Sequence, residues 1–127
     1  MPALPVVVVI EDQKELGEVI RDVLGDEGYE VVTVRDQYAA MGELRQRTVE
    51  LVVADLPTAR HGEGDTLAEI AREFPEVRLI VVVDEAQEQV PFFGRWRVSG
   101  SRVILRRPFR LDDLIAASRE GIAQGPR

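Results

Sequence analysis

Short, valine-rich apolar runs separated by helix-length amphipathic stretches constrain the fold of this chain more than any other feature. The runs do not alternate apolar with polar residues, which is typical of strands buried on both faces in a parallel sheet. Five of them occur along the chain, at Val6 to Ile10, Val31 to Val34, Leu51 to Ala54, Leu79 to Val83 and Val103 to Leu105.

The stretches between these runs predict helices. The first stretch carries apolar residues at three- and four-residue steps, and Gly28 is available to end it. Asp36 is a candidate cap for the second helix, and the third runs from about Thr66 to Phe74. The fourth starts at Pro91 or is broken there. The last opens after Pro108, and its predicted apolar side holds Leu111, Leu114, Ile115 and Ile122.

Alternating strands and helices joined by right-handed crossovers predict an α/β fold, a three-layer, doubly wound parallel sheet of the (βα)5 type. The length of 127 residues favours a single domain, 1–127, with its core at about 5–123 and a frayed tail at 124–127. Whether the chain is a whole protein or a domain of a longer one stays open.

Composition excludes several classes of function. Without cysteine the chain has no disulfide, thiolate metal site or cysteine nucleophile, and a reducing cytoplasm is the default compartment. A net charge of -7 disfavours binding to nucleic acid. The longest apolar run, Leu4 to Ile10, is too short to cross a bilayer. We therefore expect a cytoplasmic protein that binds neither nucleic acid nor membrane.

Charged residues gather where the predicted strands end. Because α/β folds place ligand sites at the carboxyl ends of their strands, these residues are candidates for a site. Converging carboxylates repel one another unless a cation joins them, and such oxygen donors suit Mg²⁺. Asp55 would then attack phosphorus to give an aspartyl phosphate. The strand-end residues are Glu11, Asp12, Asp55, Asp84, Arg106 and Arg107, of which Arg107 is the candidate cation.

A simpler role is open for some of these residues. Glu11 or Asp12, taken alone, would equally well cap the helix that follows. Asp55 is followed by Leu56 and Pro57, which begin no helix, so a site role is favoured there. The single histidine, His61, lies in the loop after the third run, and we expect it to be solvated.

Together these residues resemble, over nearly the whole chain, the receiver domain of bacterial two-component response regulators, the CheY-like fold. The resemblance rests on Glu11 and Asp12, on Asp55 within 51–57, on 74–77 and on 100–109. It implies a sheet of strand order 2-1-3-4-5. It also implies that Asp55 accepts phosphate from a histidine kinase. Four groups would hold the magnesium ion: Glu11, Asp12, Asp55 and the carbonyl of Pro57. The peptide bond before Pro108 would be cis.

Several positions depart from the family pattern. Val83 stands where receiver domains usually have a threonine or serine, so no hydroxyl is available for a phosphoryl group. Arg107 replaces a lysine with a broader planar group, and Asp84 adds negative charge if its side chain faces the site. Ile104 replaces the usual aromatic residue of the fifth strand. These departures predict an atypical receiver.

An aromatic segment in the region of the fourth helix predicts a contact surface. Three aromatic residues within five positions cannot all face inward from one helix, so at least one is exposed. The family resemblance implies a dimer and partner surface formed by the fourth helix, the fifth strand and the last helix. The predicted interface residues are Phe92, Phe93, Trp96, Arg102, Asp112 and Asp113.

The favoured function is a stand-alone receiver module of two-component phosphorelay signalling that is not an enzyme. It would act through protein–protein contacts with a histidine kinase, a phosphotransfer protein or a downstream protein, with phosphorylation of Asp55 weakened or absent. One alternative is a conventional phospho-acceptor that works as a phosphorelay shuttle. A magnesium-dependent phosphohydrolase is disfavoured, because no acid follows Asp55 two residues on.

Overall fold

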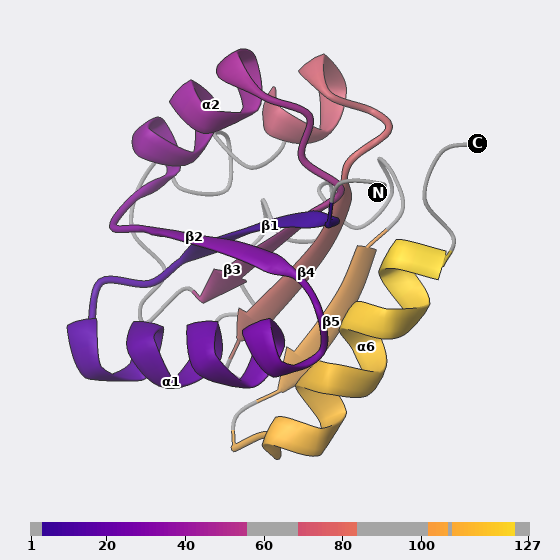
Figure 1. The fold of residues 1–127 in the computed structure, drawn as a ribbon. Helices are drawn as coiled ribbons and strands as arrows, with labels where there is room; N and C mark the ends of the chain where they lie inside the picture. The colour runs from indigo at the N-terminus through magenta and orange to yellow at the C-terminus, as the bar shows by residue number, and fades with distance from the viewer. Residues whose placement is uncertain (1–3, 56–68, 84–101, 107, 124–127) are drawn as a thin grey trace.

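Five parallel strands form one sheet in the order β2-β1-β3-β4-β5, which confirms the predicted doubly wound fold. The structure is a computed structural model, and it describes residues 4–55, 69–83, 102–106 and 108–123. Figure 1 shows β1 in the interior of the sheet and β2 and β5 at its edges. The strands are β1 (Val6–Ile10), β2 (Glu30–Val34), β3 (Leu51–Asp55), β4 (Arg78–Val83) and β5 (Arg102–Arg106).

Most strands extend past the apolar runs that predict them. β2 begins at Glu30 and β4 at Arg78, one residue before each run. Both charged residues join the sheet through the main chain, since Glu30 is in register with Val6, and Arg78 with Leu51. Backbone pairing depends on the neighbouring strand and not on an apolar side chain, which explains the extra residues.

The end of α1 (Lys14–Asp26) and the start of α2 (Gln37–Gln46) lie where predicted. After α1 the chain turns at Gly28, whose φ of +93° lies in the region that favours glycine. At the start of α2, the Asp36 side chain accepts a hydrogen bond of 2.8 Å from the backbone N–H of Ala39. Asp36 therefore caps α2 as predicted.

The later helices are described in part. Residues 69–73 are helical, in agreement with the third predicted helix as far as the description reaches. The region of the fourth predicted helix lies outside the described residues. The last helix, α6 (Leu111–Ala123), begins where predicted. Leu114 is fully buried in it, but Leu111 is 39 % exposed, so its assignment to the buried side was wrong. Leu111 is the first residue of the helix, before the buried stripe begins.

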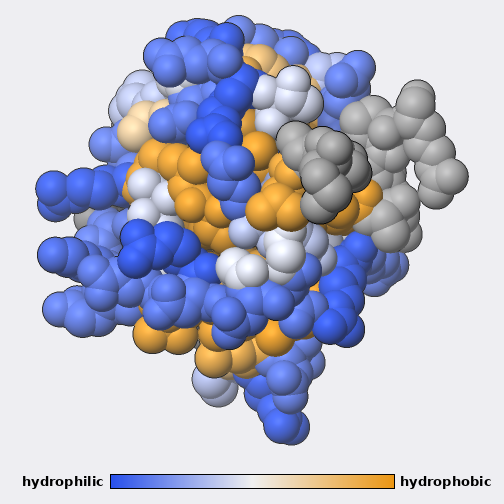
Figure 2. Space-filling model, in the orientation of Figure 1, coloured by the Kyte–Doolittle hydropathy of each residue, from blue (hydrophilic) through white to orange (hydrophobic). Residues whose placement is uncertain are grey.

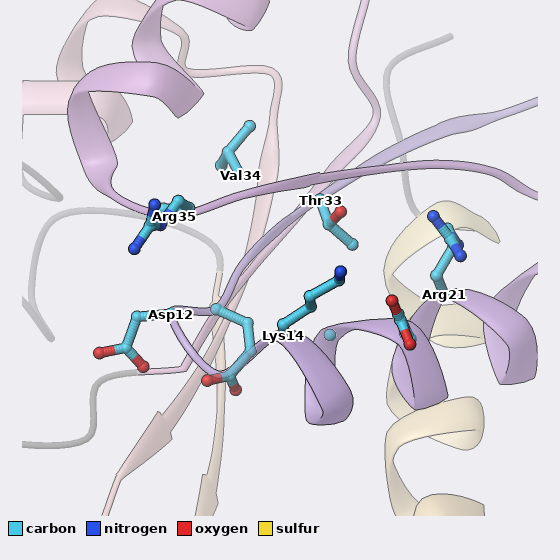
Figure 3. A pocket seen from close by; sticks show the side chains of 9 residues that line it. Asp12, Lys14, Arg21, Thr33, Val34 and Arg35 are labelled. Atoms are coloured by element: carbon cyan, nitrogen blue, oxygen red, sulfur yellow. The ribbon is translucent and has the colours of Figure 1, made fainter.

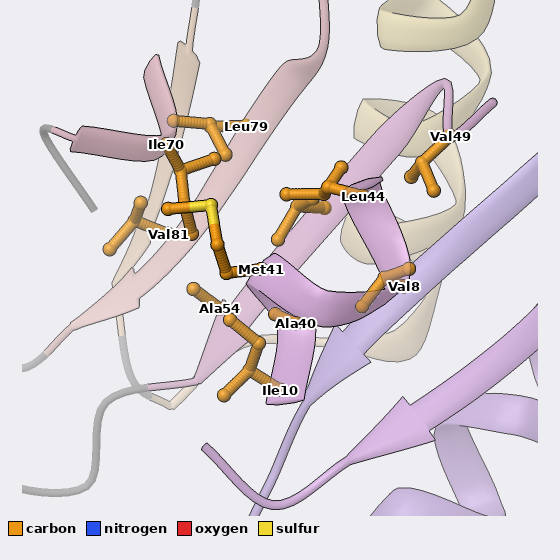
Figure 4. Packing of buried hydrophobic residues seen from close by; sticks show 11 residues of the cluster. Val8, Ile10, Ala40, Met41, Leu44, Val49, Ala54, Ile70, Leu79 and Val81 are labelled. Atoms are coloured by element: carbon orange, nitrogen blue, oxygen red, sulfur yellow. The ribbon is translucent and has the colours of Figure 1, made fainter. Parts of the chain in front are cut away.

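Two apolar clusters fill the space on the two faces of the sheet. On one face, Val8 and Ile10 of β1 pack with Ala40, Met41 and Leu44 of α2, and residues 69–73 add Ile70 (Figure 4). On the other face, Val7 and Val9 pack with side chains of α1 and α6, including Ile20, Leu24 and Leu114. Helices thus cover both faces, which confirms the three layers.

Polar and charged side chains cover most of the surface in Figure 2, and apolar ones gather between α1 and α2, where β2 forms the edge of the sheet. Val31, Val32 and Val34 of β2 are accordingly only half-buried. Within the described ranges, no helix has the length and apolar character that a membrane span requires.

Candidate functional site

The carboxyl ends of the strands bring the predicted site positions to one edge of the sheet. Ile10 of β1 is in register with Ala54 of β3, so Glu11 and Asp55 follow paired residues on neighbouring strands. Asp55 is itself in register with Val82 of β4. The backbone therefore places the acid pair and Asp55 on adjacent strand ends, as the strand pattern predicts.

Among the charged side chains of this edge that the structure describes, Glu11 is the most enclosed, with an exposed fraction of 6 %. Its Oε2 accepts a hydrogen bond of 3.1 Å from the backbone N–H of Gln13, at the start of α1. Gln13 itself makes no side-chain cap. Glu11 thus satisfies a backbone donor at the helix start, as a capping residue would, while it also stands beside Asp55. Asp12, the next residue, is exposed.

β4 and β5 end next to each other beside this edge. Val83, the last residue of β4, is in register with Arg106, the last residue of β5. Val83 follows Val82, which is in register with Asp55. The position where receiver domains usually have threonine or serine therefore holds a valine, and it ends β4 next to the end of β3. Arg106 is exposed.

Several predicted residues lie outside the described part of the chain. They include Pro57, Arg107 and the aromatic residues Phe92, Phe93 and Trp96, together with His61 and Asp84. The predicted cis peptide bond joins Arg107 to Pro108 and so lies outside it as well. The described side chains of 4–54, 69–82, 105–106 and 108–122 contain no group of three acidic or histidine residues that could hold a metal ion.

The predicted interface is described only at its α6 end. Asp112 and Asp113 are both exposed in the first turn of that helix. The Asp112 carboxylate lies 3.8 Å from the guanidinium of Arg110, and the Asp113 carboxylate accepts a hydrogen bond of 3.4 Å from the Arg110 backbone N–H. Arg102 begins β5, next to Leu79 in register. Because Asp112 and Asp113 are exposed, both carboxylates are accessible to a binding partner.

Sequence reasoning missed a pocket of about 390 Å³ beside the acid pair. It lies between α1 and the end of β2, and Figure 3 shows its side chains. Glu11 and Asp12 line one part, and residues such as Lys14, Arg21 and Thr33 line another. The only sequence signal for it is the seven-residue spacing of Lys14 and Arg21, which places both on one side of α1.

Comparison with known proteins identifies the family. Residues 7–119 match the model of the response regulator receiver domain. One curated relative is the nitrogen assimilation regulatory protein NtrX of Azorhizobium caulinodans, 25 % identical over 118 residues. The match covers 91 % of this chain and 26 % of the relative, so the chain spans about a quarter of that protein's length.

Solved receiver domains share the fold. The receiver domain of NtrX from Brucella abortus superposes with a TM-score of 0.77 at 21 % identity, over 94 % of this chain and 99 % of that one. A CheY-like receiver domain protein from Methanospirillum hungatei gives a TM-score of 0.83 at 16 % identity, over 96 % of each chain. With its family match, strand order and strand-end acids, the chain belongs to the response regulator receiver domain family of two-component signalling.

Proposed function

We propose that this chain is an atypical receiver module that acts through protein–protein contacts, with phosphorylation of Asp55 weakened or absent. Receiver domains are generally signalling domains that interact with kinases or downstream effectors, and not enzymes. The observation that carries the proposal is the valine at the end of β4, because Val83 directly follows Val82, which is in register with Asp55.

Valine in this place removes a hydrogen-bond donor from the site. A phosphoryl group on Asp55 carries negatively charged oxygens, and a threonine or serine hydroxyl would donate to one of them. Hydrogen bonds to charged groups contribute roughly 1.5 to 3 kcal/mol. Losing one therefore lowers the equilibrium ratio of phosphorylated to unphosphorylated protein by about 10- to 100-fold. Arg107 in place of lysine adds a second difference, since a planar guanidinium does not replace a compact ammonium at a tight site.

The four groups predicted to hold a metal ion at this edge suit magnesium, since each of them offers an oxygen atom. Receiver domains typically bind Mg²⁺ at the phosphorylation site, and here Glu11, Asp12, Asp55 and the carbonyl of Pro57 would hold it. The bound ion supplies positive charge that offsets the oxygens of the incoming phosphoryl group. Asp55 provides the carboxylate oxygen that bonds to phosphorus as the donor's bond breaks. Buried Glu11, held by the Gln13 N–H, keeps the loop after β1 in place.

The partner surface would combine the aromatic residues Phe92, Phe93 and Trp96 with Arg102 and the first turn of α6. Asp112 and Asp113 support this surface, because both carboxylates are exposed and would pair with basic groups of a second copy or another protein. We propose that residues 1–127 form one receiver domain. The partner is a histidine kinase, a phosphotransfer protein or a downstream protein.

A phosphorylation assay tests the proposal. The chain is incubated with a small-molecule phosphodonor and Mg²⁺, and intact-mass analysis measures the fraction that carries one phosphoryl group. We expect little adduct on the wild type, none on Asp55→Asn, and a yield at least about tenfold higher on the double variant Val83→Thr/Arg107→Lys. A wild-type yield equal to that of the double variant would instead establish a conventional phospho-acceptor.

A binding assay tests the other half of the proposal. Pull-down from lysate followed by titration with the purified partner gives its affinity for the wild type and for Asp55→Asn. Equal affinities are expected for a phosphorylation-independent contact. A partner that binds only the phosphorylated wild type would contradict it.

A further inference from the structure

The pocket between α1 and the end of β2 is lined by three side-chain hydrogen-bond donors, Lys14, Arg21 and Thr33. Figure 3 shows the Lys14 ammonium directed toward the Thr33 hydroxyl, with Arg21 on the same side. Lys14 and Arg21 come from α1 and Thr33 from β2, so two elements form the cluster. Asp12 lies at the opposite end of the pocket, the end that also holds Arg35.

The two cations of this cluster are available to a ligand. Other arginines of the fold are engaged by carboxylates, as Arg47 is by Glu30 and Arg119 by Glu27. Across the described residues, neither Lys14 nor Arg21 forms an ion pair or a hydrogen bond through its side chain. Both remain exposed, so their positive charge faces the pocket and the solvent.

We propose that this pocket binds a small-molecule oxyanion, a phosphate or a phosphate ester, through Lys14, Arg21 and Thr33. Charge-assisted hydrogen bonds from ammonium and guanidinium groups to phosphate oxygens are among the strong ones, and a hydroxyl adds a third donor. The pocket volume of about 390 Å³ falls within the range of small-molecule sites, roughly 300 to 1,000 Å³.

Glu18 sets the strength of this binding from the same wall. It lines the pocket four residues after Lys14 and three before Arg21, so all three share one side of α1. Its carboxylate repels an anion and lowers the affinity. The site therefore predicts effects of opposite sign, since removing Arg21's charge weakens binding and removing Glu18's charge tightens it.

A titration followed by NMR tests the proposal on the full chain, with a chelator present so that no metal at the acid pair contributes. The probes are inorganic phosphate and glycerol 3-phosphate, and the readout is the shift of the Gly17, Thr33 and Val34 amides. We expect one saturable site. Tighter binding of the ester than of phosphate shows that the pocket takes esters, and equal binding shows that it takes the free anion.

Charge variants supply the controls. Arg21→Gln should weaken binding about tenfold, and Glu18→Gln should tighten it. Arg72→Gln removes an exposed charge outside the pocket and should change the Kd less than about twofold. The proposal is overturned if neither probe saturates by about 10 mM, or if Arg72→Gln weakens binding as much as Arg21→Gln does.

Discussion

Replacing Gly17 with alanine should stabilise the protein. Gly17 lies inside α1, where glycine is less favourable than alanine by about 0.8 to 1.0 kcal/mol. A Cβ atom there would lie 3.7 Å from Cγ of Glu11 and 3.9 Å from Cγ2 of Thr33. These are ordinary van der Waals separations, so the methyl group needs no rearrangement. The expected gain is about 1 kcal/mol in the free energy of unfolding, or about 4 °C in Tm for a domain of this size.

Two further glycines serve as controls. Gly42 lies inside α2 with no atom within 4 Å of an added Cβ, so Gly42→Ala should show the gain from helix propensity alone. Gly28 has a φ of +93°, which an alanine adopts only with strain. Gly28→Ala should therefore lower stability, by about 1 kcal/mol.

Urea unfolding at equilibrium measures all three variants, with the midpoint reporting stability and an unchanged m-value confirming comparable unfolding. The reasoning on Gly17 is refuted if Gly17→Ala lowers the midpoint while Gly42→Ala raises it. That result would mean that Glu11 and Thr33 leave no room for a methyl group beside α1.

Two other changes test the helix cap and a half-buried tyrosine. Asp36→Ala removes the acceptor of the Ala39 N–H and should lower the free energy of unfolding by about 1 kcal/mol in the urea assay, and an unchanged midpoint would show that the cap contributes nothing. Burial raises the pKa of the Tyr29 hydroxyl above its usual 10.0, Glu27 raises it further, and Arg119 opposes both. The folded state thus holds the Tyr29 proton more tightly than the unfolded state does. The contribution of this hydroxyl to stability is therefore complete below about pH 10 and is lost as the pH rises through the folded pKa. Tyr29→Phe should reduce the loss of stability between about pH 9 and 11, and an equal loss in both proteins would contradict this.

The strands could be predicted because β-branched residues recur in short runs. The residues at which each strand begins and ends depend instead on pairing with the neighbouring strands. Nothing in the side chains of Glu30 and Arg78 favours a strand, and both enter the sheet through register with β1 and β3. Leu111 shows the same limit in a helix. It fits the apolar periodicity of α6 but precedes the turn that contacts the sheet, so it stays 39 % exposed.

The candidate site could be predicted as far as strand ends determine it. The positions of Glu11, Asp55 and Val83 follow from where each apolar run stops. The hydrogen bond from the Gln13 N–H to Glu11 is local and fits the capping role that the sequence leaves open for Glu11. The pocket beside it depends instead on how α1 lies against the end of β2. That arrangement is set by tertiary packing, which no local pattern encodes.

The interior position of β1 limits how this protein can change shape. Its valines alternate between the two apolar clusters, Val7 and Val9 on one side and Val8 on the other, and both flanking strands bond to it. Moving β1 would disturb both layers at once. Glu11 and Asp12 therefore directly follow a strand that is held by a neighbour on each side and by an apolar cluster on each face, so displacing the acid pair through β1 would be costly.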